Sequence, residues 1–215
     1  MKRLLLLAAA LCIGTAALAQ SPYNYQRRSI FDALPVDAES IVFLGDSITD
    51  GCEWNELLGN PHAVNRGISA DRSGWLLDRL DVLIAGQPAK LFLMIGTNDL
   101  SRDATPEEVA GNIASLIARF QAESPRTQLY IESILPVNGV DFQQYPRHYV
   151  VNPKVVAANA LIEALCREKQ VTYIDLWTPM ATADGLLNPA YSNDGLHLMA
   201  EGYAVWKQVI EPFVN

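Results

Sequence analysis

The strongest constraint on the fold of this chain is the alternation, from residue 41 onward, of short apolar runs with longer segments of helical periodicity. Several runs are almost continuously apolar and β-branched, as expected for strands that are buried on both faces of a parallel sheet. The order β-α-β-α-β-α-β-α-β-α predicts one three-layer α/β/α domain with a five-stranded parallel sheet and right-handed crossovers. The expected strands span residues 41–44, 62–65, 91–95, 128–134 and 171–176.

Four further segments carry helical patterns. In residues 71–84 the apolar side chains fall mostly on one side of a helix, with charged side chains opposite. Thr105-Pro106-Glu107-Glu108 is a capping box with proline at the first helical position, which predicts a helix that extends to Ala122. Two more helices are expected over residues 153–169 and 199–214.

Residues 1–19 are expected to be a signal peptide that precedes a folded domain of residues 20–215. Lys2 and Arg3 give a basic start, residues 4–19 carry no charge, and Ala17-Leu18-Ala19 is a small-x-small cleavage site. The apolar run is short for a bilayer span and ends in a cleavage motif, so we expect no integral membrane association. The chain is therefore expected to be exported, to the periplasm or beyond the cell.

The charge of the chain weighs against nucleic-acid partners. The formal net charge is −8, and cleavage after residue 19 would make it more negative because it removes Lys2 and Arg3. An acidic chain without a basic run is poorly suited to bind nucleic acid or an anionic membrane surface.

The cysteines predict neither a disulfide framework nor a metal site. Cys12 would leave with the signal peptide, and an oxidising compartment would permit a disulfide between Cys52 and Cys166, which the sequence leaves open. No cluster of cysteine and histidine has metal-ligand spacing, so we expect no metal.

Polar clusters follow three of the expected strands, and a fourth precedes the last helix. The first three are Gly45-Asp46-Ser47, Asn65-Arg66-Gly67 and Gly96-Thr97-Asn98-Asp99, and they should share one edge, because the carboxyl ends of parallel strands meet there. The fourth, Asp194-Gly195-Leu196-His197, lies in a long loop. Long loops in compact domains usually have a function. The clusters contain a nucleophile, a base, a carboxylate that can orient the base and oxyanion donors, which predicts a serine hydrolase.

With these motifs in this order, the chain resembles the SGNH (GDSL) hydrolase superfamily, and within it the platelet-activating-factor-acetylhydrolase-like branch. The resemblance implies a flavodoxin-like five-stranded sheet and esterase chemistry without a cofactor. Ala70 departs from it, since many relatives carry glycine there. The resemblance places the family's conserved serine, glycine, asparagine, histidine and acidic residue on Ser47, Gly67, Asn98, His197 and Asp194.

These residues predict a mechanism. Ser47 is the expected nucleophile, His197 its base and Asp194 the carboxylate that holds the imidazole, because it is the acidic residue close in sequence to a histidine. The backbone N–H groups of Ser47 and Gly67 and the side-chain amide of Asn98 are expected to form the oxyanion hole.

The substrate is less constrained than the chemistry. The leading hypothesis is an exported esterase that removes short acyl groups, such as acetyl, from a small-molecule or glycan ester. A lysophospholipase or thioesterase on lipid acyl chains, and a catalytically silent glycan-binding protein, are the alternatives. A nucleotide-binding protein is disfavoured, since neither G-x-G-x-x-G nor a P-loop follows the first strand. The aromatic segment 137–152 could form either a wall of the substrate pocket or an ordinary surface loop.

Overall fold

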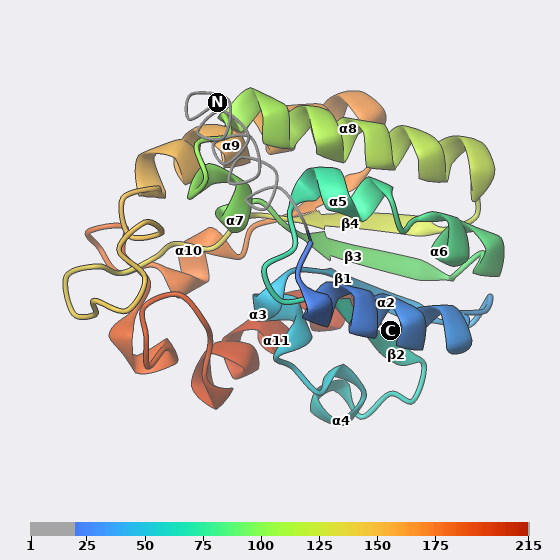
Figure 1. The fold of residues 1–215 in the computed structure, drawn as a ribbon, viewed down its shortest axis with the longest axis horizontal. Coiled ribbons are helices and arrows are strands. Elements are labelled where there is room, and N and C mark those ends of the chain that lie inside the picture. Colours follow the sequence, from blue (N-terminus) through green and yellow to red (C-terminus); the bar gives the residue numbers. More distant parts are fainter. Residues whose placement is uncertain (1–19, 215) are drawn as a thin grey trace, which may run out of the picture.

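A five-stranded parallel sheet forms the centre of the molecule, with helices on both faces (Figure 1). The computed structural model describes residues 20–214, so the expected signal peptide lies outside the described residues. The strand order is β2-β1-β3-β4-β5 with parallel pairing throughout, which confirms the predicted α/β class. The strands are β1 (Ile41–Gly45), β2 (Ala63–Gly67), β3 (Lys90–Met94), β4 (Gln128–Glu132) and β5 (Thr172–Ile174).

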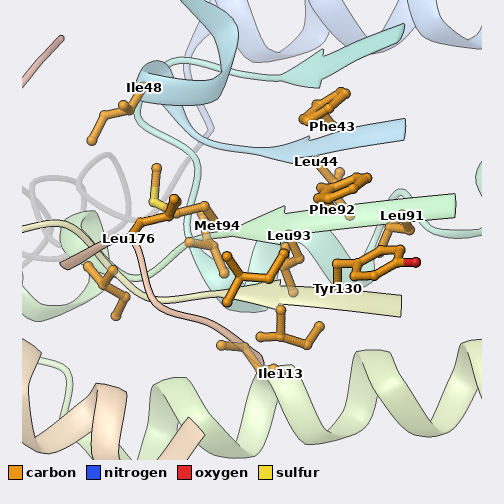
Figure 2. Close-up of a cluster of buried hydrophobic side chains, with 14 of the residues drawn as sticks. Phe43, Leu44, Ile48, Leu91, Phe92, Leu93, Met94, Ile113, Tyr130 and Leu176 are labelled. Atoms are coloured by element: carbon orange, nitrogen blue, oxygen red, sulfur yellow. The ribbon is translucent and has the colours of Figure 1, made fainter. Parts of the chain in front are cut away.

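Aromatic side chains form a stacked row on one face of this sheet (Figure 2). Phe43 lies opposite Phe92 in the register of β1 and β3, and Phe92 lies opposite Tyr130 in the register of β3 and β4. The ring centroids of these two pairs are 4.9 and 4.6 Å apart. Trp54, in α4 (Trp54–Leu58), continues the row at 4.0 Å from Phe43. Stacked aromatic pairs stabilise beyond the area they bury, so this row supports the central register.

The other face of the sheet packs against two long helices, α8 (Pro106–Glu123) and α9 (Asn152–Lys169). Figure 2 shows Leu93 of β3 and Ile113 of α8 on this side, and both side chains are buried. The predicted capping box begins α8, because the Thr105 hydroxyl accepts from the Glu108 N–H while the Glu108 carboxylate accepts from the Thr105 N–H. The helical pattern of the sequence therefore located α8 closely.

Two helical features differ from the sequence expectations. The segment 71–84 forms two short helices, α5 (Ser73–Leu77) and α6 (Asp81–Gly86), and not one. Between them, Arg79 turns inward, and its guanidinium binds the Asp71 carboxylate at 2.8 Å and the carbonyls of Arg66 and Gly45. The helix α2 (Pro22–Ala33) was also not expected, although Ser21 caps it and proline occupies its first turn.

The remaining elements are short, apart from the last helix. The structure describes no helix long and apolar enough to cross a membrane within residues 20–214. Cys52 and Cys166 are both buried free thiols, so they form no disulfide. The elements not yet named are α3 (Ser47–Asp50), α7 (Thr97–Leu100), α10 (Trp177–Met180), the 3-10 helix η1 (Pro189–Tyr191) and α11 (Ala200–Val214).

Candidate active site

Ser47 stands at the first turn of α3, directly beyond the carboxyl end of β1. The turn between strand and helix is tight: a Cβ at Gly45 would collide with the Met94 carbonyl and the Thr49 hydroxyl. Asp46 caps α3, because its Oδ1 accepts the Ile48 N–H at 3.0 Å. In this motif, Gly45 permits the close packing of β1 against its neighbours, Asp46 caps α3, and Ser47 places its hydroxyl at the edge of the sheet.

His197 connects Ser47 to Asp194 in one hydrogen-bonded chain. The Ser47 Oγ lies 2.9 Å from His197 Nε2, and His197 Nδ1 lies 2.8 Å from Asp194 Oδ2. A carboxylate can only accept, so Nδ1 carries the proton and Nε2 is free to accept from the serine hydroxyl. This is the arrangement in which histidine can act as a base toward serine.

Asp194 is held as a charged acceptor. Its Oδ1 accepts the backbone N–H groups of Leu196 and His197 at 2.9 and 2.8 Å. Partial burial opposes the charge, but these bonds and the bond from the His197 ring outweigh it and hold the pKa of Asp194 below its ordinary value. The carboxylate can therefore stabilise an imidazolium at His197.

The loop around this pair is braced from both sides. The Ser192 hydroxyl donates to the His197 carbonyl at 2.6 Å and accepts the Gly195 N–H at 2.8 Å. The Gly195 carbonyl accepts the Asn138 N–H at 2.8 Å. Gly195 has a φ of +76°, and a Cβ there would collide with the Asn138 carbonyl. Glycine thus lets the loop fold tightly enough for Asp194 to face His197.

Asn98 presents its amide at the same edge of the sheet, from the first turn of α7 after β3. One N–H of its Nδ2 donates to the Asp71 carbonyl at 3.1 Å, and its Oδ1 lies 3.2 Å from His148 Nε2. The second Nδ2 hydrogen remains for another acceptor. The neighbouring Asp99 braces the turn, since its carboxylate accepts both the N–H and the hydroxyl of Ser73.

The sequence predicts the Gly67 N–H as an oxyanion donor. In the structure this N–H donates to Asn65 Oδ1 at 2.7 Å, so it already has an acceptor. The amide of Asn65 is itself fixed, because its Nδ2 donates to three carbonyls of the α3 region. A Cβ at Gly67 would collide with the backbone of Asp50, so the close packing of β2 on α3 explains this glycine.

Ala70 offers a free donor in the same loop. Its φ is +66°, and its N–H has no hydrogen-bond acceptor within residues 20–214. Positive φ favours glycine, so alanine is an unusual residue for this backbone conformation. The sequence carries no signal for this donor, because its availability depends on the φ of Ala70 and on the hydrogen bonds around it.

The aromatic segment 137–152 lies against the site. Tyr145 stands edge-on to the ring of His197, with ring centroids 5.3 Å apart. Tyr149 donates its hydroxyl to the Asp194 carbonyl at 2.6 Å. Of the two readings that the sequence left open, the structure therefore favours a wall of the site over an ordinary surface loop.

Three buried carboxylates, those of Asp46, Asp71 and Asp99, lie close to one another, and Asp46 directly precedes the nucleophile. Asp46 is fully buried, and burial, together with the nearby carboxylates of Asp99 and Asp71, raises its pKa to about 7 although the Ile48 N–H opposes this. Among the described residues, no group of three or more histidine, cysteine or acidic side chains could hold a metal ion.

Comparison with known proteins shows the family of this chain. The sequence profile of the GDSL-like lipase/acylhydrolase family matches residues 43–205. Platelet-activating factor acetylhydrolase IB subunit alpha1 of Pongo abelii is 29% identical over 188 residues, covering 84% of this chain and 77% of that protein.

Solved structures share the fold of this chain. A GDSL-like lipase from Bacteroides thetaiotaomicron is 26% identical, with a TM-score of 0.78 and coverage of 89% of this chain and 97% of that one. An acetylxylan esterase from Geobacillus stearothermophilus, 18% identical, shares the fold with a TM-score of 0.67 over 84% of this chain and 95% of that one. The chain belongs to the GDSL-like lipase/acylhydrolase family, whose members hydrolyse esters with a serine nucleophile.

Proposed function

We propose that this protein is an exported esterase that hydrolyses short acyl esters, acetyl esters above all, from a small-molecule or glycan alcohol. The observation that carries the proposal is the continuous hydrogen-bonded chain from Ser47 through His197 to Asp194. Its relatives named as acetylhydrolases support the acetyl preference. The apolar, uncharged segment after Lys2 and Arg3 supports export.

The first half of the reaction forms an acyl-enzyme. His197 Nε2 takes the proton of the Ser47 hydroxyl as Oγ attacks the ester carbonyl, and Asp194 stabilises the imidazolium. When the tetrahedral intermediate collapses, the bond to the alcohol breaks, and His197 returns the proton to the departing oxygen. The acyl group is then bound to Ser47 through an ester.

The second half releases the acid. A water molecule gives its proton to His197 Nε2 and attacks the acyl carbon, and the second intermediate expels Ser47 Oγ, which regains the proton. In both halves the carbonyl oxygen becomes negatively charged. We assign its stabilisation to the Ser47 N–H, the second amide hydrogen of Asn98 and the N–H of Ala70, in place of Gly67. One such donor contributes about 3–4 kcal/mol at the transition state.

The surroundings of Ser47 support a hydroxylated alcohol, such as a sugar, on the far side of the ester. The Tyr145 ring lies edge-on to the His197 ring, and His148 lies against Asn98, so two rings of one segment border the base and the proposed oxyanion donor. Tyr145 is 37% exposed, and an exposed aromatic side chain beside the base is suited to contact a sugar ring.

A chain-length series tests the proposal. Rates on p-nitrophenyl acetate should exceed those on the octanoate and palmitate esters, and acetate should be released from acetylated sugars. Ser47→Ala should reduce turnover to background while leaving the far-UV circular dichroism unchanged. A preference for palmitoyl esters would favour the lipid-directed alternative, and failure of Ser47 to react with a fluorophosphonate would favour the silent glycan-binding protein.

Export needs its own test. In a bacterial host, the mature protein should be recovered outside the cytoplasm with an N-terminus at Gln20. Retention of residues 1–19 on the purified protein would contradict cleavage.

A further inference from the structure

A second histidine, His148, lies at the site and takes no part in the hydrogen-bonded chain from Ser47 to Asp194. His148 belongs to the segment 137–152, whose two ends are tied together by Asn152: its Oδ1 accepts the Val137 N–H, and its Nδ2 donates to the Val137 carbonyl. The neighbouring Asn138 fastens the segment to the catalytic loop at Gly195. His148 is therefore held on an anchored segment.

The Nε2 of His148 faces two oxygens. It lies 3.2 Å from Asn98 Oδ1 and 3.1 Å from Ser101 Oγ. The Ser101 hydroxyl already donates its proton to the Asn98 backbone carbonyl at 3.1 Å, so its oxygen is an acceptor toward the ring. Both neighbours accept, and the ring nitrogen between them must carry a hydrogen. His148 thus donates from Nε2 to the Asn98 side chain.

The environment of His148 keeps the ring neutral near pH 7. Burial, with the positive charge of Arg102 and the proximity of His197, lowers the pKa of His148 to about 4. A neutral ring with a hydrogen on Nε2 has no hydrogen on Nδ1. The ring can therefore donate to Asn98 without placing a second cation beside the imidazolium that forms at His197.

This contact helps to fix which way the Asn98 amide faces. His148 donates to its oxygen and the Asp71 carbonyl accepts from its nitrogen, so both contacts favour one orientation. A flipped amide would oppose oxygen to oxygen at Asp71 and N–H to N–H at His148. In the observed orientation the second Nδ2 hydrogen is available to the developing oxyanion.

We propose that His148 is a positioning residue that acts through Asn98, holding the amide in the orientation that donates to the oxyanion. This inference rests on the proposed function, because it requires Asn98 to be an oxyanion donor. Tyr145 contributes to the same arrangement, since its ring stands edge-on to both His148 and His197, at 5.9 and 5.3 Å. The segment 137–152 therefore contacts both Asn98, the proposed oxyanion donor, and His197, the base.

A double-mutant cycle tests the inference with p-nitrophenyl acetate as substrate. His148→Leu should lower kcat roughly tenfold to a hundredfold with less than about a twofold change in KM, because a full oxyanion donor accounts for about 10²–10³ in kcat. His148→Gln, whose amide can donate from a similar position, should recover most of the rate. In an Asn98→Ala background, His148→Leu should have almost no further effect, since its target is absent.

The outcomes separate the two claims. If Asn98→Ala retains full activity, the oxyanion assignment in the proposed function is wrong. If Asn98→Ala is impaired but His148→Leu is not, or if the two losses multiply, the positioning role is overturned. Gln143→Leu, an exposed change in the same segment, is the matched control and should leave kcat unchanged. If His148→Leu does not fold, His148→Ala enters the same cycle without added bulk.

Discussion

Asp46 gives the sharpest test of the electrostatics under the nucleophile. Its carboxyl is fully buried, one oxygen caps α3, and the other has no hydrogen-bond partner among the described residues. Burial raises its pKa from 3.8 to about 7, so the folded protein binds a proton there that the unfolded chain releases near pH 4. Because the folded state holds more protons, stability falls as the pH rises between these two values.

The size of the effect follows from the shift. A difference of about three pH units corresponds to about 4 kcal/mol over the whole window, and about 3 kcal/mol of it should be lost between pH 5 and pH 8. Asp46→Asn keeps an oxygen that can accept the Ile48 N–H but cannot ionise. The free energy of unfolding of the parent protein, relative to this variant, should therefore fall by about 3 kcal/mol from pH 5 to pH 8.

Urea unfolding followed by tryptophan fluorescence at pH 5, 6, 7 and 8 measures this difference. A constant offset between the two proteins would reflect the cost of burying an amide there, and only the change with pH reports the titration. Asp37→Asn is the control: Asp37 is exposed, and the Ser40 hydroxyl lowers its pKa, so its difference should be flat over this range. A flat profile for Asp46→Asn as well would refute the reasoning.

Three other predictions use the same structure. Glu132 is buried and accepts a hydrogen bond from the Trp206 side-chain N–H, and burial raises its pKa to about 8. The parent protein should therefore lose stability as the pH rises from about 4.5 to 8, and Glu132→Gln should not show this loss in urea unfolding. Asp194→Asn should lower kcat on p-nitrophenyl acetate by roughly 10³–10⁴ with the fold intact, because an amide favours the wrong tautomer of His197; a loss below tenfold would contradict this role. Tyr149→Phe should lower the free energy of unfolding by about 1–2 kcal/mol, since the Asp194 carbonyl loses its 2.6 Å donor, and an unchanged urea midpoint would show that this bond is not stabilising.

Local patterns in the sequence determined much of this protein. The strands, and the helices that begin at Pro106 and near residue 153, follow from periodicity and capping, which depend on residues only a few positions apart. The same holds for Asp194 and His197, which share one tight loop. Ser47 and Asn98 could be placed on one edge because parallel strands carry their carboxyl ends there.

Tertiary structure decided what depends on distant neighbours. The break at Arg79 reflects an ion pair with Asp71 and carbonyls of two strands, and no periodicity within the segment encodes those partners. The sequence also could not show which backbone N–H groups remain free to donate. The Gly67 N–H is occupied, because it donates to the Asn65 side chain, whose orientation is fixed by its bond to the Thr49 carbonyl of α3.

The contact between Ser47 and His197 shows most clearly what the sequence alone does not determine. The pair is separated by 150 residues and meets at 2.9 Å, a distance that only the docking of the last loop on the sheet edge can produce. His148 could be read from the sequence as one polar residue in an aromatic segment, but its role depends on Asn98 and Ser101, 50 and 47 residues away. Local propensity selects elements and their ends, whereas the pairing of polar atoms is determined by packing between them.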